Sequence, residues 1–214
     1  GLLEVDGGSF RFQRRSQAEY IAKALGHYHV YQCKYSGRLW TQTLPLLRDQ
    51  GNALLTNQEI VSQQCHYFSE GIKRLVLQME LRDVVVVLVH LSLKFRHRQY
   101  QLRELHSILK EIKKPVVVAG DFNLFRGIWE LQLFLEATGL QSADRDGRAS
   151  HSSRNPCRQL DFILHSPEIR VTQFQVPKVP YSDHLPLICD FEVEKALGRS
   201  TQERKQWLGR AAEG

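Results

Sequence analysis

The apolar positions along the chain predict short strands separated by a few amphipathic helices. Residues 84–89 form a valine-rich run that is apolar on both faces, which is typical of a central strand covered above and below. Residues 115–119 form a second such run, and Gly120 is expected to end it because glycine lets the backbone turn without a Cβ clash. Between the two runs, leucines at helical spacing predict an amphipathic helix over residues 97–112.

Weaker patterns predict the remaining elements. Strands are expected over residues 2–6, 28–35, 51–56, 73–80, 159–164, 170–176 and 187–193, and helices over residues 16–25 and 128–137. Residues 57–72 and 141–156 are polar and are expected to be connections. Because strands outnumber helices, and the helices lie between groups of strands, the sequence predicts a layered α/β sandwich.

Length and composition are those of one globular domain. The chain has 214 residues, of which 42% are hydrophobic and 24% are charged. We expect a monomeric domain over residues 1–194 and a polar, basic tail over residues 195–214 that is either a terminal helix or disordered. No apolar run approaches the roughly 18 residues that a transmembrane helix needs. The four cysteines include no Cys-x-x-Cys pair, which argues against structural zinc and favours a reducing, cytoplasmic location.

The net charge of +6 suggests an anionic partner, but its distribution weakens that inference. The tail alone has five basic and two acidic residues, so it carries +3 of the total. A solvated basic tail therefore explains half of the excess positive charge.

Polar side chains recur at the points where the apolar runs end. Glu4 ends the first strand, His90 ends the valine-rich run, and Asp121 and Asn123 follow the next strand. Asp121 and Asn123 stand two apart, on one side of an extended backbone, where they suit a metal, a water or a phosphate oxygen. Asp and Asn are also common turn residues, so this pair alone favours neither interpretation.

Three further residues complete the candidate set. Asp161 interrupts an apolar strand, and because an unpaired buried carboxylate is costly we expect a histidine or a cation as its partner. Asp183 and His184 precede the last strand. Together the carboxylates and histidines suffice for an oxygen-rich Mg²⁺ site with an acid/base pair, with Mn²⁺ as an alternative and with Glu4 and Asp183 as the metal-binding carboxylates. Zinc would prefer His and Cys at short spacing, which the sequence lacks.

The order of these motifs resembles the endonuclease/exonuclease/phosphatase superfamily of Mg²⁺-dependent phosphoesterases. The motifs are Leu-Leu-Glu-Val-Asp around Glu4, Val-His-Leu-Ser-Leu around His90, Gly-Asp-Phe-Asn at 120–123, Leu-Asp-Phe-Ile-Leu at 160–164 and Ser-Asp-His-Leu-Pro at 182–186. The resemblance implies a four-layer α/β sandwich, with two mixed β-sheets flanked by helices and the site at one edge of the sheets. It also implies a preceding strand that ends in a metal-supporting asparagine. Residues 1–214 do not contain that N-terminal strand; we expect either that it lies upstream of residue 1, with any targeting segment, or that another segment replaces it.

The resemblance also implies a role for each residue of the site. Asp121 would orient or deprotonate the attacking water, and Asn123 would donate a hydrogen bond to the phosphate. His184 would contact the scissile phosphate and take part in proton transfer, while Asp161 would hold its tautomer. His90 would be a phosphate contact or a leaving-group acid. The implied reaction is in-line attack of water on a phosphoester.

The substrate is open between nucleic acid and other phosphoesters. The basic balance and Arg158, one of several arginines in the segments that flank the site, favour DNA or RNA. A phospholipid or sphingomyelin-type phosphodiesterase that binds a lipid head group is an alternative, as are a phosphatase and a non-catalytic binding module of the same fold. Asn52 is a candidate substrate contact near the cleft, although a structural role is the simpler expectation.

Other polar and aromatic residues near the motifs have simpler interpretations. Phe125, Trp129 and Phe134 are expected to belong to a helix core rather than to a base-stacking platform. His151 is expected to be a surface residue of the polar loop before Asp161.

Overall fold

The computed structural model describes residues 1–8, 15–34, 50–179 and 181–194, and the predicted tail lies outside these ranges. Six strands form its central sheet: β4 (Ser62–Tyr67), β5 (Leu75–Glu80), β6 (Val85–His90), β7 (Val116–Asp121), β8 (Gln141–Ser142) and β9 (Asp161–His165). Their spatial order is β4-β5-β6-β7-β9-β8. β6 and β7 are parallel and the other neighbours are antiparallel, so the sheet is mixed.

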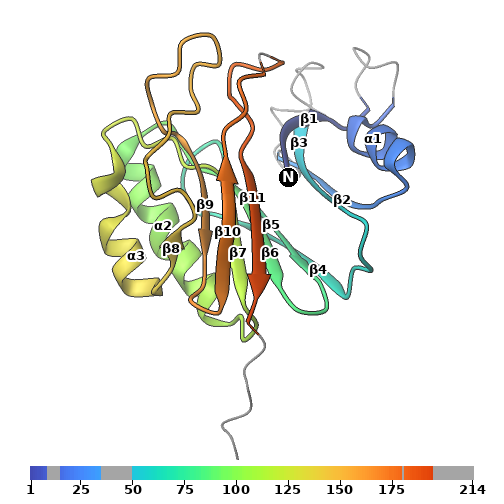
Figure 1. Ribbon diagram of the computed structural model, residues 1–214, viewed down its shortest axis with the longest axis horizontal. Helices are drawn as coiled ribbons and strands as arrows, with labels where there is room; N and C mark the ends of the chain where they lie inside the picture. The colour runs from blue at the N-terminus through green and yellow to red at the C-terminus, as the bar shows by residue number, and fades with distance from the viewer. Residues whose placement is uncertain (9–14, 35–49, 180, 195–214) are drawn as a thin grey trace, which may run out of the picture.

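Two helices cover one face of the central sheet, as Figure 1 shows: α2 (Phe95–Lys110) and α3 (Gln132–Thr138). In β6, alternate residues point to opposite faces of the sheet, so Val87 packs against the helices while Leu88 packs on the other side. The helix face of α2 that carries Leu102 and Leu105 closes this core. No helix within the described ranges is long and apolar enough to cross a membrane.

The other face of the central sheet is covered by strands from both ends of the chain (Figure 1). One group is the antiparallel sheet β1-β3-β2, with β1 (Leu2–Asp6), β2 (Tyr28–Cys33) and β3 (Gln50–Thr56), and the other is the hairpin of β10 (Ile169–Gln175) and β11 (Ile188–Val193). Helix α1 (Gln17–Leu25) packs on the three-stranded sheet through Ala18, against Val5 and Ala53. The layers are therefore helix, sheet, sheet and helix, and the predicted mixed α/β sandwich is confirmed.

The sequence missed two strands and shifted several element boundaries; α2, for example, spans Phe95–Lys110 where a helix over 97–112 was expected. β4 and β8 lie in segments predicted to be connections, because β4 is a polar strand at the sheet edge and β8 has two residues. The predicted helix over residues 128–137 is divided into a 3-10 turn, Ile128–Leu131, followed by α3. Helix α1 begins as expected, with Ser16 as its N-cap and Gly26 as its left-handed C-cap.

Gly120 does not end its strand, contrary to the prediction. β7 continues through Gly120 to Asp121, with a φ of 143° at the glycine. A Cβ atom here would lie 1.9 Å from the carbonyl oxygen of Val89 on the neighbouring strand. Glycine is therefore required because β6 and β7 approach closely next to the functional residues, and not because the chain turns.

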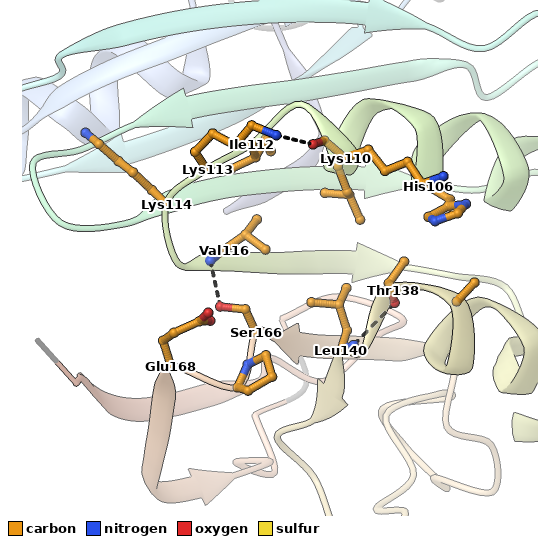
Figure 2. Close-up of a pocket in the computed structure, with 13 residues that line it drawn as sticks. His106, Lys110, Ile112, Lys113, Lys114, Val116, Thr138, Leu140, Ser166 and Glu168 are labelled. Carbon is orange, nitrogen blue, oxygen red and sulfur yellow. Dashed lines mark hydrogen bonds between the residues drawn. The ribbon is translucent and has the colours of Figure 1, made fainter. Parts of the chain in front are cut away.

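A pocket of about 270 Å³ lies where α2 ends and β7 begins (Figure 2). Two of its lysines, Lys113 and Lys114, have backbone or side-chain partners. The ammonium of Lys113 donates to the carbonyl of Lys110, 3.2 Å away, and that of Lys114 donates to the carbonyl of Leu81 and pairs with Glu80. Lys113 therefore caps the C-terminal end of α2, where positive charge offsets the helix dipole, and Lys114 ties the following segment to the end of β5.

Candidate active site

Sheet register brings three of the predicted residues into one row. Asp121 on β7 lies opposite His90 on the parallel neighbour β6, and also opposite Asp161 on the antiparallel neighbour β9. Adjacent strands are about 4.8 Å apart, so the three side chains are neighbours at the same edge of the central sheet. The row consists of residues far apart in sequence, and backbone pairing alone sets its spacing.

Asp121 and Asn123 form a closed pair at the centre of the row. Asp121 is 5% exposed, and its two carboxylate oxygens accept the backbone N–H and the side-chain amide of Asn123, at 2.8 and 3.0 Å. The same amide also donates to the carbonyl of Leu91 at 2.9 Å. Burial raises the pKa of Asp121, but the contact with His90, the charge of His184 and the Asn123 N–H lower it overall. Donation from Asn123 to a phosphate stays a prediction and would replace one of these contacts.

Asp161 has the histidine partner that its position in an apolar strand requires. One of its oxygens, Oδ2, lies 2.6 Å from Nδ1 of His184 and accepts the hydroxyl of Ser150, also at 2.6 Å. Because Nδ1 of His184 contacts Asp161, a different group can be contacted through the other ring nitrogen, Nε2. The Asp161 contact raises the pKa of His184. Fully buried Ser150 also accepts the backbone N–H groups of Leu160 and Asp161, both at 3.3 Å, which ties the start of β9 to the loop.

His90 stands at the other end of the row, buried beside a lysine. Its Nε2 lies 3.1 Å from Oδ2 of Asp121 and also contacts the ammonium of Lys73. A single ring nitrogen cannot donate to a carboxylate and accept from an ammonium at once, so the tautomer decides which contact is made. Among the described residues, Nδ1 of His90 has no hydrogen-bond partner. Burial lowers the pKa of this histidine.

Glu4 reaches the cleft from the three-stranded sheet, in a left-handed backbone conformation with φ of 58°. Its Oε1 accepts the buried ammonium of Lys34 at 2.8 Å and lies 3.7 Å from that of Lys73. Its backbone N–H points at Oδ1 of Asn52, 3.4 Å away. Partial burial raises the pKa of Glu4, but Lys34, His90 and Lys73 outweigh burial and lower it. Asn52 is fully buried, is not among the residues lining the cleft, and contacts the Glu4 backbone, so its role as a substrate contact stays a prediction.

Asp183 and His184 enter the site on the segment before β11. Asp183 is exposed, and its neighbour His184 packs on His151, with 4.8 Å between the two ring centroids. His151 and His184 also form an isolated β-bridge. His151 is therefore part of the site rather than a surface residue of the loop, because the loop folds back onto the last strand segment.

All of these acidic and histidine side chains line one open cleft of about 570 Å³. The predicted residues in its wall are Glu4, His90, Asp121, Asn123, Asp161, Asp183 and His184. Arg158 lies outside the lining, with its guanidinium 5.7 Å from the ring centroid of Phe125, which does line the cleft. The structure therefore gathers the candidate catalytic residues and places Arg158 at the margin.

Comparison with known proteins agrees with this geometry. A model of the endonuclease/exonuclease/phosphatase family matches residues 1–184 of the chain. The chain belongs to this family. Two UPF0294 proteins, from Yersinia pseudotuberculosis and Yersinia pestis, are each 36% identical to it over 94 residues. The aligned part is 43% of this chain and 35% of each relative, so the chain matches about a third of the length of these curated relatives.

Solved structures of family members have the same fold. The catalytic domain of human Nocturnin with bound sulfate matches with a TM-score of 0.62 and 21% identity, over 83% of this chain and 76% of that one. A Neisseria 3′ phosphatase bound to a product DNA hairpin matches with a TM-score of 0.63 and 15% identity, over 82% of this chain and 83% of that one. A mannosyl-6-phosphatase from Bacteroides thetaiotaomicron matches with a TM-score of 0.66 and 15% identity, over 82% of this chain and 81% of that one. At these identities the similarity shows the fold.

The donor chemistry of the cleft fits the divalent metal that the endonuclease/exonuclease/phosphatase family generally uses. Two groups in the described residues have ligand atoms within 4.8 Å of one another: Asp121, Asp161 and His184, and His151, Asp183 and His184. Glu4 belongs to neither group, and its carboxylate is paired with the ammonium groups of Lys34 and Lys73. Carboxylate oxygens are the ligands that Mg²⁺ and Mn²⁺ prefer.

Four residues of the site were not predicted from the sequence. No local motif predicts the contacts made by Lys34, Lys73 and Ser150, which join residues far apart in the sequence. His151 was expected on the loop surface. One signal was available: Lys73 comes two residues before β5, which pairs with the valine-rich run, so its side chain lies beside His90 at the end of β6. The others depend on how separate segments meet in three dimensions.

The aromatic predictions were partly wrong. Phe134 is buried in the core under α3, as expected. Phe125 and Trp129 are 40% and 54% exposed, because their segment is a loop and a 3-10 turn rather than the buried face of a helix.

Proposed function

We propose that this family member is a Mg²⁺-dependent phosphodiester hydrolase, with Mn²⁺ as an alternative, that cleaves DNA or RNA. One observation carries the proposal: the row His90–Asp121–Asp161, with His184 held on Asp161, faces a single open cleft. A carboxylate for water and an oriented histidine for proton transfer are the protein groups that phosphoester hydrolysis needs.

The contacts suggest a division of labour in an in-line attack. Asp121 orients or deprotonates the water, whose oxygen forms a bond to phosphorus as the bond to the leaving oxygen breaks. His184 contacts the phosphate through Nε2 and takes part in proton transfer, since Nδ1 is held by Asp161. His90, next to Lys73, contacts a phosphate oxygen or protonates the leaving group. Glu4 and Asp183 would hold the metal ion, and its positive charge would offset the negative charge that grows on the phosphate oxygens.

Two observations support nucleic acid as the substrate: the positive charge of the chain, and a DNA-bound structure of the same fold. The chain has a net charge of +6, and Arg158 lies at the margin of the cleft. A structure with the same fold, the Neisseria 3′ phosphatase, is bound to a DNA hairpin. Phosphate contacts dominate the affinity of proteins for nucleic acids, so a cationic margin next to a phosphoesterase site favours such a polyanion.

A parallel substrate panel tests the proposal. Plasmid DNA, RNA oligomers, bis-p-nitrophenyl phosphate and sphingomyelin are each incubated with the protein in Mg²⁺, in Mn²⁺ and in EDTA. We expect hydrolysis of the nucleic acids and of bis-p-nitrophenyl phosphate in either metal and none in EDTA. Activity on sphingomyelin alone would instead assign a lipid phosphodiesterase. Inactivity on every substrate, on this chain and on one extended upstream, would contradict the hydrolase proposal.

A further inference from the structure

A group of exposed apolar side chains lies on the two loops that leave the catalytic edge of the central sheet. Leu93 and Phe125 both line the cleft and are 58% and 40% exposed. Phe95 and Trp129 follow on the same two segments, with Trp129 54% exposed. Together with Arg126 these residues make up what we call the aromatic rim. It continues the cleft outward from the phosphoesterase residues.

The aromatic rim is ordered by ring stacking. The rings of Phe95 and Trp129 are 5.8 Å apart between centroids and are tilted by 47°. The guanidinium of Arg126 lies 4.5 Å from the centroid of Phe95, and the indole N–H of Trp129 donates to the Arg126 carbonyl at 2.6 Å. At the cleft, Arg158 lies over Phe125 at 5.7 Å. Each ring is thus paired with a neighbouring ring or a guanidinium rather than left loose in solvent.

A buried ion pair fixes both loops beneath the rim. Arg98 and Glu130 are 1% and 4% exposed, and two guanidinium nitrogens of Arg98 donate to the Glu130 carboxylate at 2.6 to 3.0 Å. A third nitrogen of Arg98 donates to the carbonyl of Leu93 at 2.6 Å, while Glu130 accepts the backbone N–H of Arg126 at 3.0 Å. One ion pair therefore holds the Leu93 loop and the Arg126 loop together, so the rim is preorganised.

The charge of the rim has one sign. Residues 91–97 and 122–131 carry exposed Lys94, Arg96 and Arg126, and their only acidic side chain is Glu130, which Arg98 neutralises. Exposed aromatic side chains beside these cations match the two repeating parts of a nucleic acid, flat bases and anionic phosphates. In a duplex the bases are stacked on one another, so only a single strand can offer them to these rings.

We propose that the aromatic rim binds the single-stranded segment of DNA or RNA next to the scissile phosphate, with bases on Phe125 and Trp129 and phosphates on the arginines. This inference rests on the proposed function and names the form of its substrate. A lipid surface is the other partner that exposed apolar and cationic side chains could contact. The single strand is favoured because Leu93 and Phe125 line the same cleft as the phosphoesterase residues, and because Arg126 and Arg158 place cations beside the rings of Phe95 and Phe125, where phosphates can bind.

Binding without turnover tests the rim directly. Fluorescence anisotropy is recorded in EDTA with a labelled single-stranded oligonucleotide and with a duplex of the same sequence. We expect the wild type to prefer the single strand, and Phe125→Ala and Trp129→Ala each to weaken its binding by about 5- to 100-fold. Trp129→Phe keeps a flat ring and should retain most of the affinity. Arg126→Gln should lower the slope of log K against log salt by about 0.7.

The control variant is Leu133→Ala, which removes a 77% exposed apolar side chain of α3 that does not line the cleft. It should bind like the wild type. The proposal that the aromatic rim binds a single strand would be contradicted if Phe125→Ala and Trp129→Ala are folded and bind DNA as Leu133→Ala does. Variants that keep DNA binding but lose adhesion to vesicles of phosphatidylcholine and phosphatidylserine would also contradict it, and would assign a membrane contact. A wild type that binds the single strand yet hydrolyses no phosphoester in Mg²⁺ would instead refute the proposed function and leave the rim intact.

Discussion

The two sides of the cleft are constructed by different means. On one side, His90, Asp121 and Asp161 are adjacent because β6, β7 and β9 are paired in register, and backbone hydrogen bonds set their spacing. On the other side, Glu4 comes from a separate sheet and is met by Lys34 and Lys73, whose long side chains reach it from different segments.

This difference separates rigid from adjustable parts of the site. The row has little freedom because moving one of its residues would require the central sheet to change register. The position of the Glu4 carboxylate depends on side-chain contacts, so substitutions of its lysine partners can tune it without disturbing the fold. We therefore expect large catalytic effects from the row and smaller, metal-related effects from the Glu4 side.

The largest effect is expected from Asp121→Asn. The amide nearly matches the carboxylate in shape but cannot deprotonate a water, and it offers one acceptor where Asn123 and His90 use two oxygens. We expect kcat/KM for bis-p-nitrophenyl phosphate in Mg²⁺ to fall by about 10³-fold, within the range for general acid–base groups. Activity close to the wild type would remove Asp121 from the mechanism.

Asp161→Asn should have the next largest effect, a loss of about 100-fold in kcat. The asparagine can still accept from Nδ1 of His184, but without the negative charge that stabilises a protonated ring. Measured on the same substrate, KM should change much less than kcat, since the residue acts through His184. A loss confined to KM would indicate that Asp161 only shapes substrate binding.

Lys34→Met tests the Glu4 side of the cleft. It removes the ammonium 2.8 Å from the Glu4 carboxylate, which competes with a divalent cation for the same oxygen. We expect Mg²⁺ to bind about tenfold more tightly by isothermal titration calorimetry, equivalent to about 1.4 kcal/mol. Lys34→Arg keeps the charge and serves as the control. Weaker Mg²⁺ binding in Lys34→Met would show that Lys34 orients Glu4 for the metal instead of competing with it.

An effect of similar size, on stability rather than on metal binding, is expected from Ser150→Ala, which removes a hydroxyl that hydrogen-bonds to Asp161. Its loss deletes a hydrogen bond to Asp161 and leaves the N–H groups of Leu160 and Asp161 without that acceptor. The free energy of unfolding in urea should fall by about 1–2 kcal/mol. Exposed Ser107 on α2, replaced by alanine, is the control and should change stability by less than about 0.5 kcal/mol. Equal results for the two variants would contradict this role.

The predictable part of the molecule is the part that repeats or alternates along the chain. The valine-rich strands and the leucine face of α2 predicted the central sheet and the helix that covers it. The polar residues at strand ends predicted a cluster of functional side chains at one edge of the sheet. The need of a carboxylate in an apolar strand for a partner predicted a histidine or a cation beside Asp161, and the family resemblance implied that this partner is His184.

The unpredicted part depends on contacts between distant segments. Lys34 meets Glu4 only because β2 and β1 both pair with β3, and no local pattern encodes that encounter. Arg98 belongs to a helix whose charged residues were expected to face solvent, yet it is buried against Glu130. In the same way, the exposure of Phe125 and Trp129 follows from the loop geometry that this ion pair imposes.

The most direct test of the central claim is Mg²⁺-dependent hydrolysis by His184→Ala, measured beside His106→Ala. His106 is on α2, away from the cleft, and lines the pocket in Figure 2, so its replacement controls for the loss of a histidine. If the row and its histidine perform the chemistry, His184→Ala will lose at least about 100-fold in activity with an unchanged fold, and His106→Ala will match the wild type. Equal activity in the two variants would contradict the account.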